Sequence, residues 1–277
     1  MRLFEREEFE QAILQAARRL GVSEQFVEKD YYVTEILRIV VEQLDDKAMF
    51  KGGTSLSKGW GLINRFSEDI DLFVNRDMFE SRPGGNKTDR ILKELSVTVS
   101  DHPGLTRLED EGRTIGGLGR EDYFEYRTHF PDLPGLRPVV RLEPGIASGT
   151  FPTEEVTITS LVGAYLVETG REEMADDVRG FEMTLLHYRR TFVEKLFAIH
   201  GKVQRLSRRR ASARPRRTAL PRPLRARWHG SGPQHAGLGG VRGDPTRLRP
   251  HQSRVLRVDL SATQGAFISR QSRIVPR

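Results

Sequence analysis

The sequence has no cysteine, and this absence excludes disulfide bridges and thiolate metal sites. It also lacks any apolar run approaching the roughly 18–20 residues that a membrane-spanning helix needs. The first ten residues, MRLFEREEFE, are acidic and amphipathic, which is not typical of a secretory signal peptide. We therefore expect a cytoplasmic protein without a membrane partner.

Acidic residues are almost missing from the last quarter of the chain. Residues 1–200 carry 26 Lys and Arg against 36 Asp and Glu, whereas residues 201–277 carry 19 against 2. An acidic body with a basic tail is typical of a protein that binds nucleic acid through a disordered cationic segment. The tail lacks the interleaved aromatic residues that stacking on single strands favours. A non-catalytic nucleic-acid-binding protein is thus one hypothesis, and a second explanation of the tail follows below.

Apolar periodicity predicts an α/β fold with a mixed sheet and flanking helices. Strands are expected in IDLFV and RPVVRLEPG, and helices over residues 7–20, 26–44, 157–170 and 181–203. Loops rich in Pro and Gly are expected over 82–88 and 131–138. We divide the chain into a core (1–150), a mainly helical C-terminal lobe (151–204) and an irregular tail (205–277).

The segment KGGTSLSKGWGLINRFSEDIDLF, residues 51–73, contains an Asp-x-Asp pair on an expected strand. Alternate side chains of a strand share a face, so Asp69 and Asp71 point together while Ile70 and Leu72 enter the core. Two carboxylates on one face repel each other, and a divalent cation removes this repulsion. Because Mg²⁺ prefers oxygen ligands, the pair predicts a magnesium site.

A glycine pair precedes the aspartates by a short helix. Gly52 and Gly53 would let the backbone approach a phosphate, and Thr54 or Ser55 would cap the helix that follows. A P-loop is excluded, because the segment has no G-x-x-x-x-G-K-[ST] arrangement. Either motif alone is more often a turn or a solvated strand end, but their combination favours phosphoryl transfer.

The string KGGTSLSK…RFSEDIDLF resembles the AbiEii/AbiGii toxin family, which includes the MenT toxins and belongs to the polymerase β-like nucleotidyltransferase superfamily. EKDYYVTEIL, from residue 28, resembles the helix that precedes the catalytic core in this family. RRTFVEKLFAIH, residues 189–200, resembles the helix that carries a functional lysine. The resemblance covers about residues 5–204 and rests on three motifs in the family's order.

This resemblance implies a role for each matching residue. Gly52 and Gly53 would form the phosphate loop, Asp69 and Asp71 would bind the metal, and Lys195 would hold the triphosphate. Glu143 would supply a third metal-binding carboxylate. The alternatives are a solvated helix lysine for Lys195 and an edge-strand glutamate for Glu143. The remaining candidates for nucleotide binding lie near the motifs: Thr54, Ser55, Lys58, Arg65 and Ser67.

The resemblance also implies an activity. It is the Mg²⁺-dependent transfer of a nucleoside monophosphate from an NTP to an RNA acceptor. The expected acceptor is the 3′ end of tRNA, and its modification would block translation. A cognate antitoxin is the implied protein partner, within a toxin–antitoxin or phage-defence system.

The sequence departs from the family after Gln204. The family has a further helix similar to R-H-x-x-D-L-Y, whereas this chain has no acidic residue from there until Asp244. Codons for Thr218 to His229, read one base later, permit R-H-Y-R-D-L-Y. We therefore interpret the basic tail as a frameshift product, which leaves a degenerate, inactive toxin as a further alternative.

Overall fold

A mixed sheet of eight strands forms the centre of the protein, in a computed structural model that describes residues 1–63, 69–115, 118–147 and 149–212. The strand order is β3-β5-β6-β2-β1-β8-β7, with β4 beside β5. The strands are β1 Ala48–Lys51, β2 Asp69–Val74, β3 Thr106–Arg107, β4 Arg113–Ile115, β5 Gly119–Glu125, β6 Val139–Gly145, β7 Thr153–Ile158 and β8 Phe181–Leu186. The predicted mixed sheet with flanking helices is confirmed.

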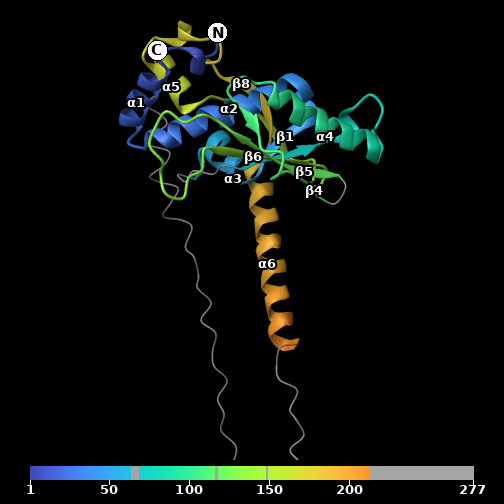
Figure 1. Ribbon diagram of the computed structural model, residues 1–277. Coiled ribbons are helices and arrows are strands. Elements are labelled where there is room, and N and C mark those ends of the chain that lie inside the picture. Colours follow the sequence, from blue (N-terminus) through green and yellow to red (C-terminus); the bar gives the residue numbers. More distant parts are fainter. Residues whose placement is uncertain (64–68, 116–117, 148, 213–277) are drawn as a thin grey trace, which may run out of the picture. The chain divides into compact units, whose positions relative to one another are not determined.

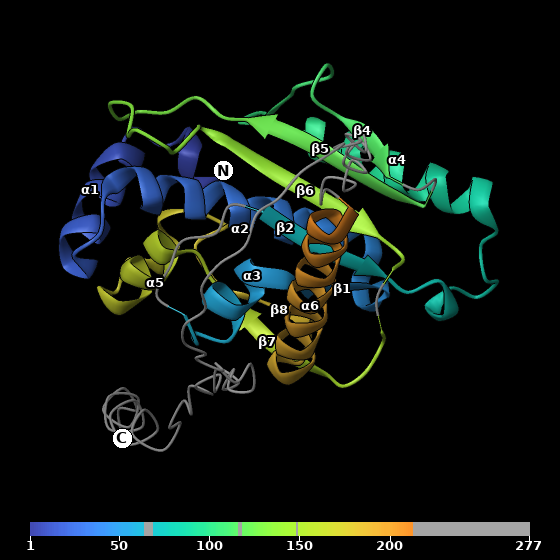
Figure 2. The same ribbon diagram turned by 90° about the horizontal axis from the view of Figure 1, so that it is seen from below.

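Helices lie on both sides of this sheet. They are α1 Phe9–Leu20, α2 Glu24–Leu44, α3 Gly52–Thr54, α4 Gly85–Ser100, α5 Leu161–Glu168 and α6 Tyr188–Ser212. Helix α2 contacts β1 and β6 and α4 contacts β5, so these two helices cover one face (Figure 1). Helix α6 leaves the sheet on the opposite side, and it lies in front of the sheet when seen from below (Figure 2). No helix in the described parts of the chain is long and apolar enough to cross a membrane.

Strand β2 shows the alternation expected from its sequence. Ile70 and Leu72 are buried in the core below α2, with exposed fractions of 0% and 1%. Asp69 and Asp71 are only half-buried and point to the opposite face. The predicted shared face of the two aspartates is therefore confirmed.

The helix predicted over residues 181–203 is wrong in its first part. Phe181–Leu186 is a strand that pairs antiparallel with β7 and touches β1, and the helix begins only at Tyr188. The alternation of Phe181, Met183 and Leu185 with Glu182 and Thr184 is a strand pattern, which the apolar content of the segment concealed. Residues 157–158 likewise belong to β7, so the mainly helical character predicted for 151–204 does not hold for these two strands.

Other boundaries also differ from expectation. Helix α4 begins at Gly85 within the loop predicted over 82–88, and neither most of α4 nor β5 was predicted. Helix α6 continues to Ser212, so the irregular tail does not begin at residue 205. The rest of the predicted tail lies outside the described residues.

A buried aspartate ties β5 to its neighbours. The Asp122 carboxylate accepts two hydrogen bonds of 3.0 Å from Arg120, one of 2.6 Å from Ser96 on α4 and one of 3.0 Å from Arg107. Burial by itself raises the pKa of Asp122, but the hydrogen bonds from Arg120 and Ser96 outweigh it and hold the pKa below its usual range.

We expect Asp122→Asn to lower the free energy of unfolding at pH 7 by about 2–4 kcal/mol, because it leaves Arg120 and Arg107 without a buried counter-charge. A depressed pKa stabilises the fold above the unfolded-state value and loses this effect as pH falls, so the difference should shrink below about pH 4. Urea unfolding at both pH values measures it. The exposed Asp110→Asn is the control, and equal stability of the two variants at pH 7 contradicts the expectation.

Candidate active site

Acidic and basic side chains share one face of the sheet where β2 and β6 pair. The strands run parallel, with Asp69 opposite Arg141 and Asp71 opposite Glu143. On the other side of β2, Lys51 at the end of β1 lies opposite Asp71. The carboxylates of Asp69, Asp71 and the expected Glu143 thus lie near two cations, Lys51 and Arg141, to which the sequence analysis assigned no role.

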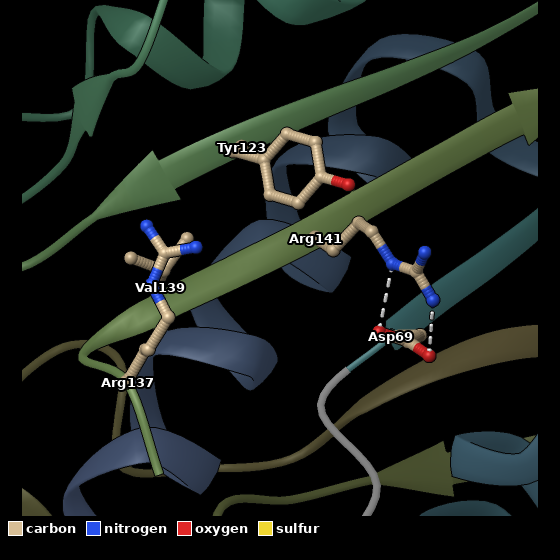
Figure 3. A pocket seen from close by; sticks show the side chains of 5 residues that line it. All are labelled: Asp69, Tyr123, Arg137, Val139 and Arg141. Atoms are coloured by element: carbon tan, nitrogen blue, oxygen red, sulfur yellow. Dashed lines mark hydrogen bonds and ion pairs between the residues drawn. The ribbon is translucent and has the colours of Figure 1, made fainter. Parts of the chain in front are cut away.

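Arg141 makes the closest contacts in this group. Its Nε and Nη2 lie 2.9 and 2.5 Å from the two carboxylate oxygens of Asp69. Figure 3 marks both contacts with dashed lines. Its Nη1 donates to Glu121 at 2.8 Å, and Nε lies 3.0 Å from Glu143. The hydrogen bond to Asp69 raises the pKa of the guanidinium, which therefore stays charged.

The remaining two carboxylates are poorly compensated. Burial raises the pKa of Asp71, with Lys51 opposing and Asp69 adding to the shift. Burial also raises the pKa of Glu143, with Arg141 opposing and Asp71 adding. Negatively charged oxygens held together at this cost fit a hard divalent cation. Among the described residues, however, no three Asp, Glu or His side chains form a ready-made metal cage.

The glycine pair lies directly against this acidic group. Gly52 has φ of +82°, and a Cβ added there would lie 1.9 Å from Oδ2 of Asp71. Both the backbone conformation and the space therefore require glycine at this position. The loop predicted to approach a phosphate is thus held beside the predicted metal-binding aspartate.

The residues after the glycines support the loop rather than line the site. The buried Thr54 hydroxyl donates to the backbone carbonyl of Asp69, and the Ser55 hydroxyl donates to that of Gly52 at 3.0 Å. The ammonium of Lys58 lies 2.7 Å from Asp30 and 3.1 Å from the carbonyl of Thr159.

The structure therefore does not bring Lys58 to the acidic group, because its charge is neutralised in a buried ion pair with Asp30. Arg65 and Ser67 lie outside the described residues. Lys195 is exposed on α6. Its positive charge is one of those that oppose the upward shift of the Asp71 pKa, so Lys195 lies near the acidic group.

Two cavities flank the acidic group. One, of about 310 Å³, is lined by Val139 and by polar side chains from β2, β5, β6 and the loop before β6 (Figure 3): Asp69, Tyr123, Arg141 and Arg137. The other, of about 500 Å³, combines Lys51, Asp71 and Glu143 with apolar residues that include Leu118 and Ile146. Asp69 therefore borders one cavity, and Asp71 and Glu143 border the other.

Sequence reasoning missed Lys51, Glu121, Tyr123 and Arg141. A signal existed for Arg141, because it lies two residues before Glu143 on an expected strand and must share its face. Glu121 and Tyr123 were missed because β5 was not predicted.

Parts of this chain are similar to known proteins. A family model described as "Nucleotidyl transferase AbiEii toxin, Type IV TA system" matches residues 35–216 and confirms the resemblance seen in the sequence. A solved structure of MenT4, a nucleotidyltransferase toxin from Mycobacterium tuberculosis H37Rv, is 20% identical with a TM-score of 0.35. That match covers 52% of this chain and 47% of the MenT4 chain, which is less than half of its length. No curated protein matches the sequence.

Replacement of Gly52 by alanine tests the contact between the loop and Asp71. Positive φ alone costs a non-glycine residue about 1–2 kcal/mol, and forced overpacking adds about 1–3 kcal/mol. Gly21→Ala is the matched control, because Gly21 has φ of +69° and open space around it. We expect Gly52→Ala to lower the free energy of unfolding in urea by at least about 1 kcal/mol more than Gly21→Ala does. Equal losses would show that Asp71 does not limit the space at Gly52.

Proposed function

Because this chain belongs to the AbiEii nucleotidyl transferase toxin family, we propose that it transfers a nucleoside monophosphate from an NTP to an RNA acceptor, with release of pyrophosphate. The observation that carries the proposal is the juxtaposition of Asp71 and Glu143 on one sheet face, with the Gly52 backbone against the aspartate. This juxtaposition supports a site in which a phosphate at the glycine loop and a cation at the two carboxylates bind side by side.

Asp69 and Asp71 are proposed to hold Mg²⁺, with Glu143 as a third ligand. When bound, the ion would neutralise the developing charge on the triphosphate. The Gly52–Gly53 loop would admit the phosphates close to the backbone. Lys195 would reach the triphosphate from α6 and stabilise the departing pyrophosphate.

We propose the 3′ end of tRNA as the acceptor, which would block aminoacylation and translation. The smaller cavity supports a single-stranded acceptor, because an aromatic ring from Tyr123 and two arginines, Arg137 and Arg141, line it. A cognate antitoxin would be the protein partner, and phage defence is the proposed setting.

The frameshift hypothesis gains support from α6. Apolar side chains spaced by four and three residues are 50–60% exposed along it: Phe192, Leu196, Ile199, Val203 and Leu206. Such a stripe is typical of a helix that packs against another helix. The family match continues to residue 216, so the departure from the family begins there and not after Gln204, just before the segment whose other frame permits a family-like helix. We propose that this helix would cover the stripe in a chain of restored frame.

The transfer reaction is tested with labelled NTPs and total tRNA, for this chain and for a version with the frame restored after Arg216, where the family match ends. We expect the restored chain to label tRNA. Asp69→Ala should reduce labelling by at least about 10²-fold, because a site reduced to Asp71 and Glu143 leaves the ion more hydrated and mobile. The control is Asp77→Ala, an exposed aspartate beyond the end of β2.

Each outcome of this assay has a distinct meaning. Labelling by the restored chain alone identifies this chain as a degenerate toxin. Labelling that survives Asp69→Ala contradicts the proposed metal site, and absence of labelling by both chains contradicts the tRNA acceptor.

A second substitution tests the lysine on α6. We expect Lys195→Gln in the restored chain to lower kcat by about 10²–10³-fold, the usual loss when one charge-stabilising group is removed. Lys202→Gln removes an exposed cation from the same side of α6, two turns further along, and should retain activity. Equal effects of the two substitutions would show that the charge of the helix matters and not the position of Lys195.

A further inference from the structure

Arg141 already occupies the carboxylate that the proposed function assigns to the metal. On the basis of that function, we propose that Arg141 is a positioning residue that holds Asp69 in an ion pair. When a nucleoside triphosphate binds, the Arg141 guanidinium would exchange Asp69 for the triphosphate. Metal binding and nucleotide binding would thereby be coupled through one side chain.

The geometry of the pair supports this inference. Both oxygens of Asp69 accept from the same guanidinium, at 2.9 Å from Nε and 2.5 Å from Nη2. Such two-pronged pairs are the strong form of the arginine–carboxylate contact. A divalent cation bound to either oxygen would lie against a fixed positive charge, so Arg141 and the metal compete for Asp69.

Arg141 can move away without leaving Glu121 unpaired. Glu121 also pairs with Arg113 and accepts from the Tyr123 hydroxyl at 2.9 Å, so it keeps two partners if Arg141 moves. The Arg141 side chain is 31% exposed and lines the smaller cavity, where a ligand can reach it. A triphosphate offers the guanidinium a more highly charged partner of matching two-pronged geometry.

A simpler role for Arg141 is general neutralisation of the acidic cluster. Arg113 provides the matched control, because it pairs with the same Glu121, is 70% exposed and has no ion pair with Asp69. If neutralisation is all that matters, removing either arginine should have similar effects on metal binding. If Arg141 competes for Asp69, only its removal should free the site.

The test is a titration of the nucleotide-free chain with Mn²⁺, followed by calorimetry or electron paramagnetic resonance. We expect Arg141→Gln to bind Mn²⁺ at least about tenfold more tightly than the unsubstituted chain. In this variant the ion no longer displaces the charge-assisted hydrogen bonds between Arg141 and Asp69, whose free energy corresponds to a change in affinity of about tenfold or more. Arg141→Lys should resemble the unsubstituted chain more closely, because it keeps the charge. Arg113→Gln should change the affinity by less than about threefold, as exposed ion pairs contribute little.

Equal tightening by Arg141→Gln and Arg113→Gln, or none by the first, overturns the inference. Asp71→Asn separates this failure from a failure of the proposed function. If Asp71→Asn abolishes Mn²⁺ binding while Arg141→Gln leaves it unchanged, only the coupling by Arg141 is refuted. If Asp71→Asn leaves Mn²⁺ binding intact, the metal site itself is wrong.

A second measurement examines the other partner of Arg141. Inorganic tripolyphosphate is titrated into the chain in the presence of EDTA, so that no metal contributes. We expect Arg141→Gln to weaken this binding about tenfold, and Arg113→Gln to leave it within about threefold. Unchanged binding by Arg141→Gln overturns the proposed exchange. Because this titration contains no metal, it tests the contact between Arg141 and the triphosphate independently of how tightly each variant binds metal.

Discussion

The parallel pairing of β2 with β6 is the constraint on which the rest of the site depends. It fixes Asp71 beside Glu143 and Asp69 beside Arg141, and the alternation of each strand directs these side chains to the same face. The opposite face buries Ile70 and Leu72, so a one-residue slip would bury the carboxylates and expose the core. The hydrophobic core thereby holds like charges together that would separate in a flexible chain.

Carboxylates held this close together repel one another and lower the stability of the fold, and neighbouring residues reduce this repulsion. Arg141 offsets the charge of Asp69, and Lys51 opposes the raised pKa of Asp71. Gly52 adopts a conformation that other residues rarely accept, which lets the loop lie against the carboxylate. Local preferences and the fold disagree at these positions, as is expected where structure has been adapted to binding or catalysis.

Much of this arrangement was predictable from the chain itself. The shared face of Asp69 and Asp71 followed from strand alternation, and the membership of the family followed from three motifs in order. The partners of Lys58 were not predictable, because Asp30 lies 28 residues away and meets it only through tertiary packing. Strand β8 was mistaken for helix because its six residues run directly into the apolar pattern of α6, and the alternation over so short a segment was overlooked. The assigned roles of the site residues stay predictions.

The central claim is that Asp69 and Asp71 hold one divalent cation beside a triphosphate at the glycine loop. The most direct measurement is anomalous diffraction from crystals of the chain grown with Mn²⁺ and a non-hydrolysable NTP analogue. The account predicts a manganese peak within coordination distance of both aspartates, with the phosphates next to Gly52 and in contact with Arg141. Manganese bound elsewhere, or phosphates held away from the glycine loop while Arg141 still pairs with Asp69, would contradict it.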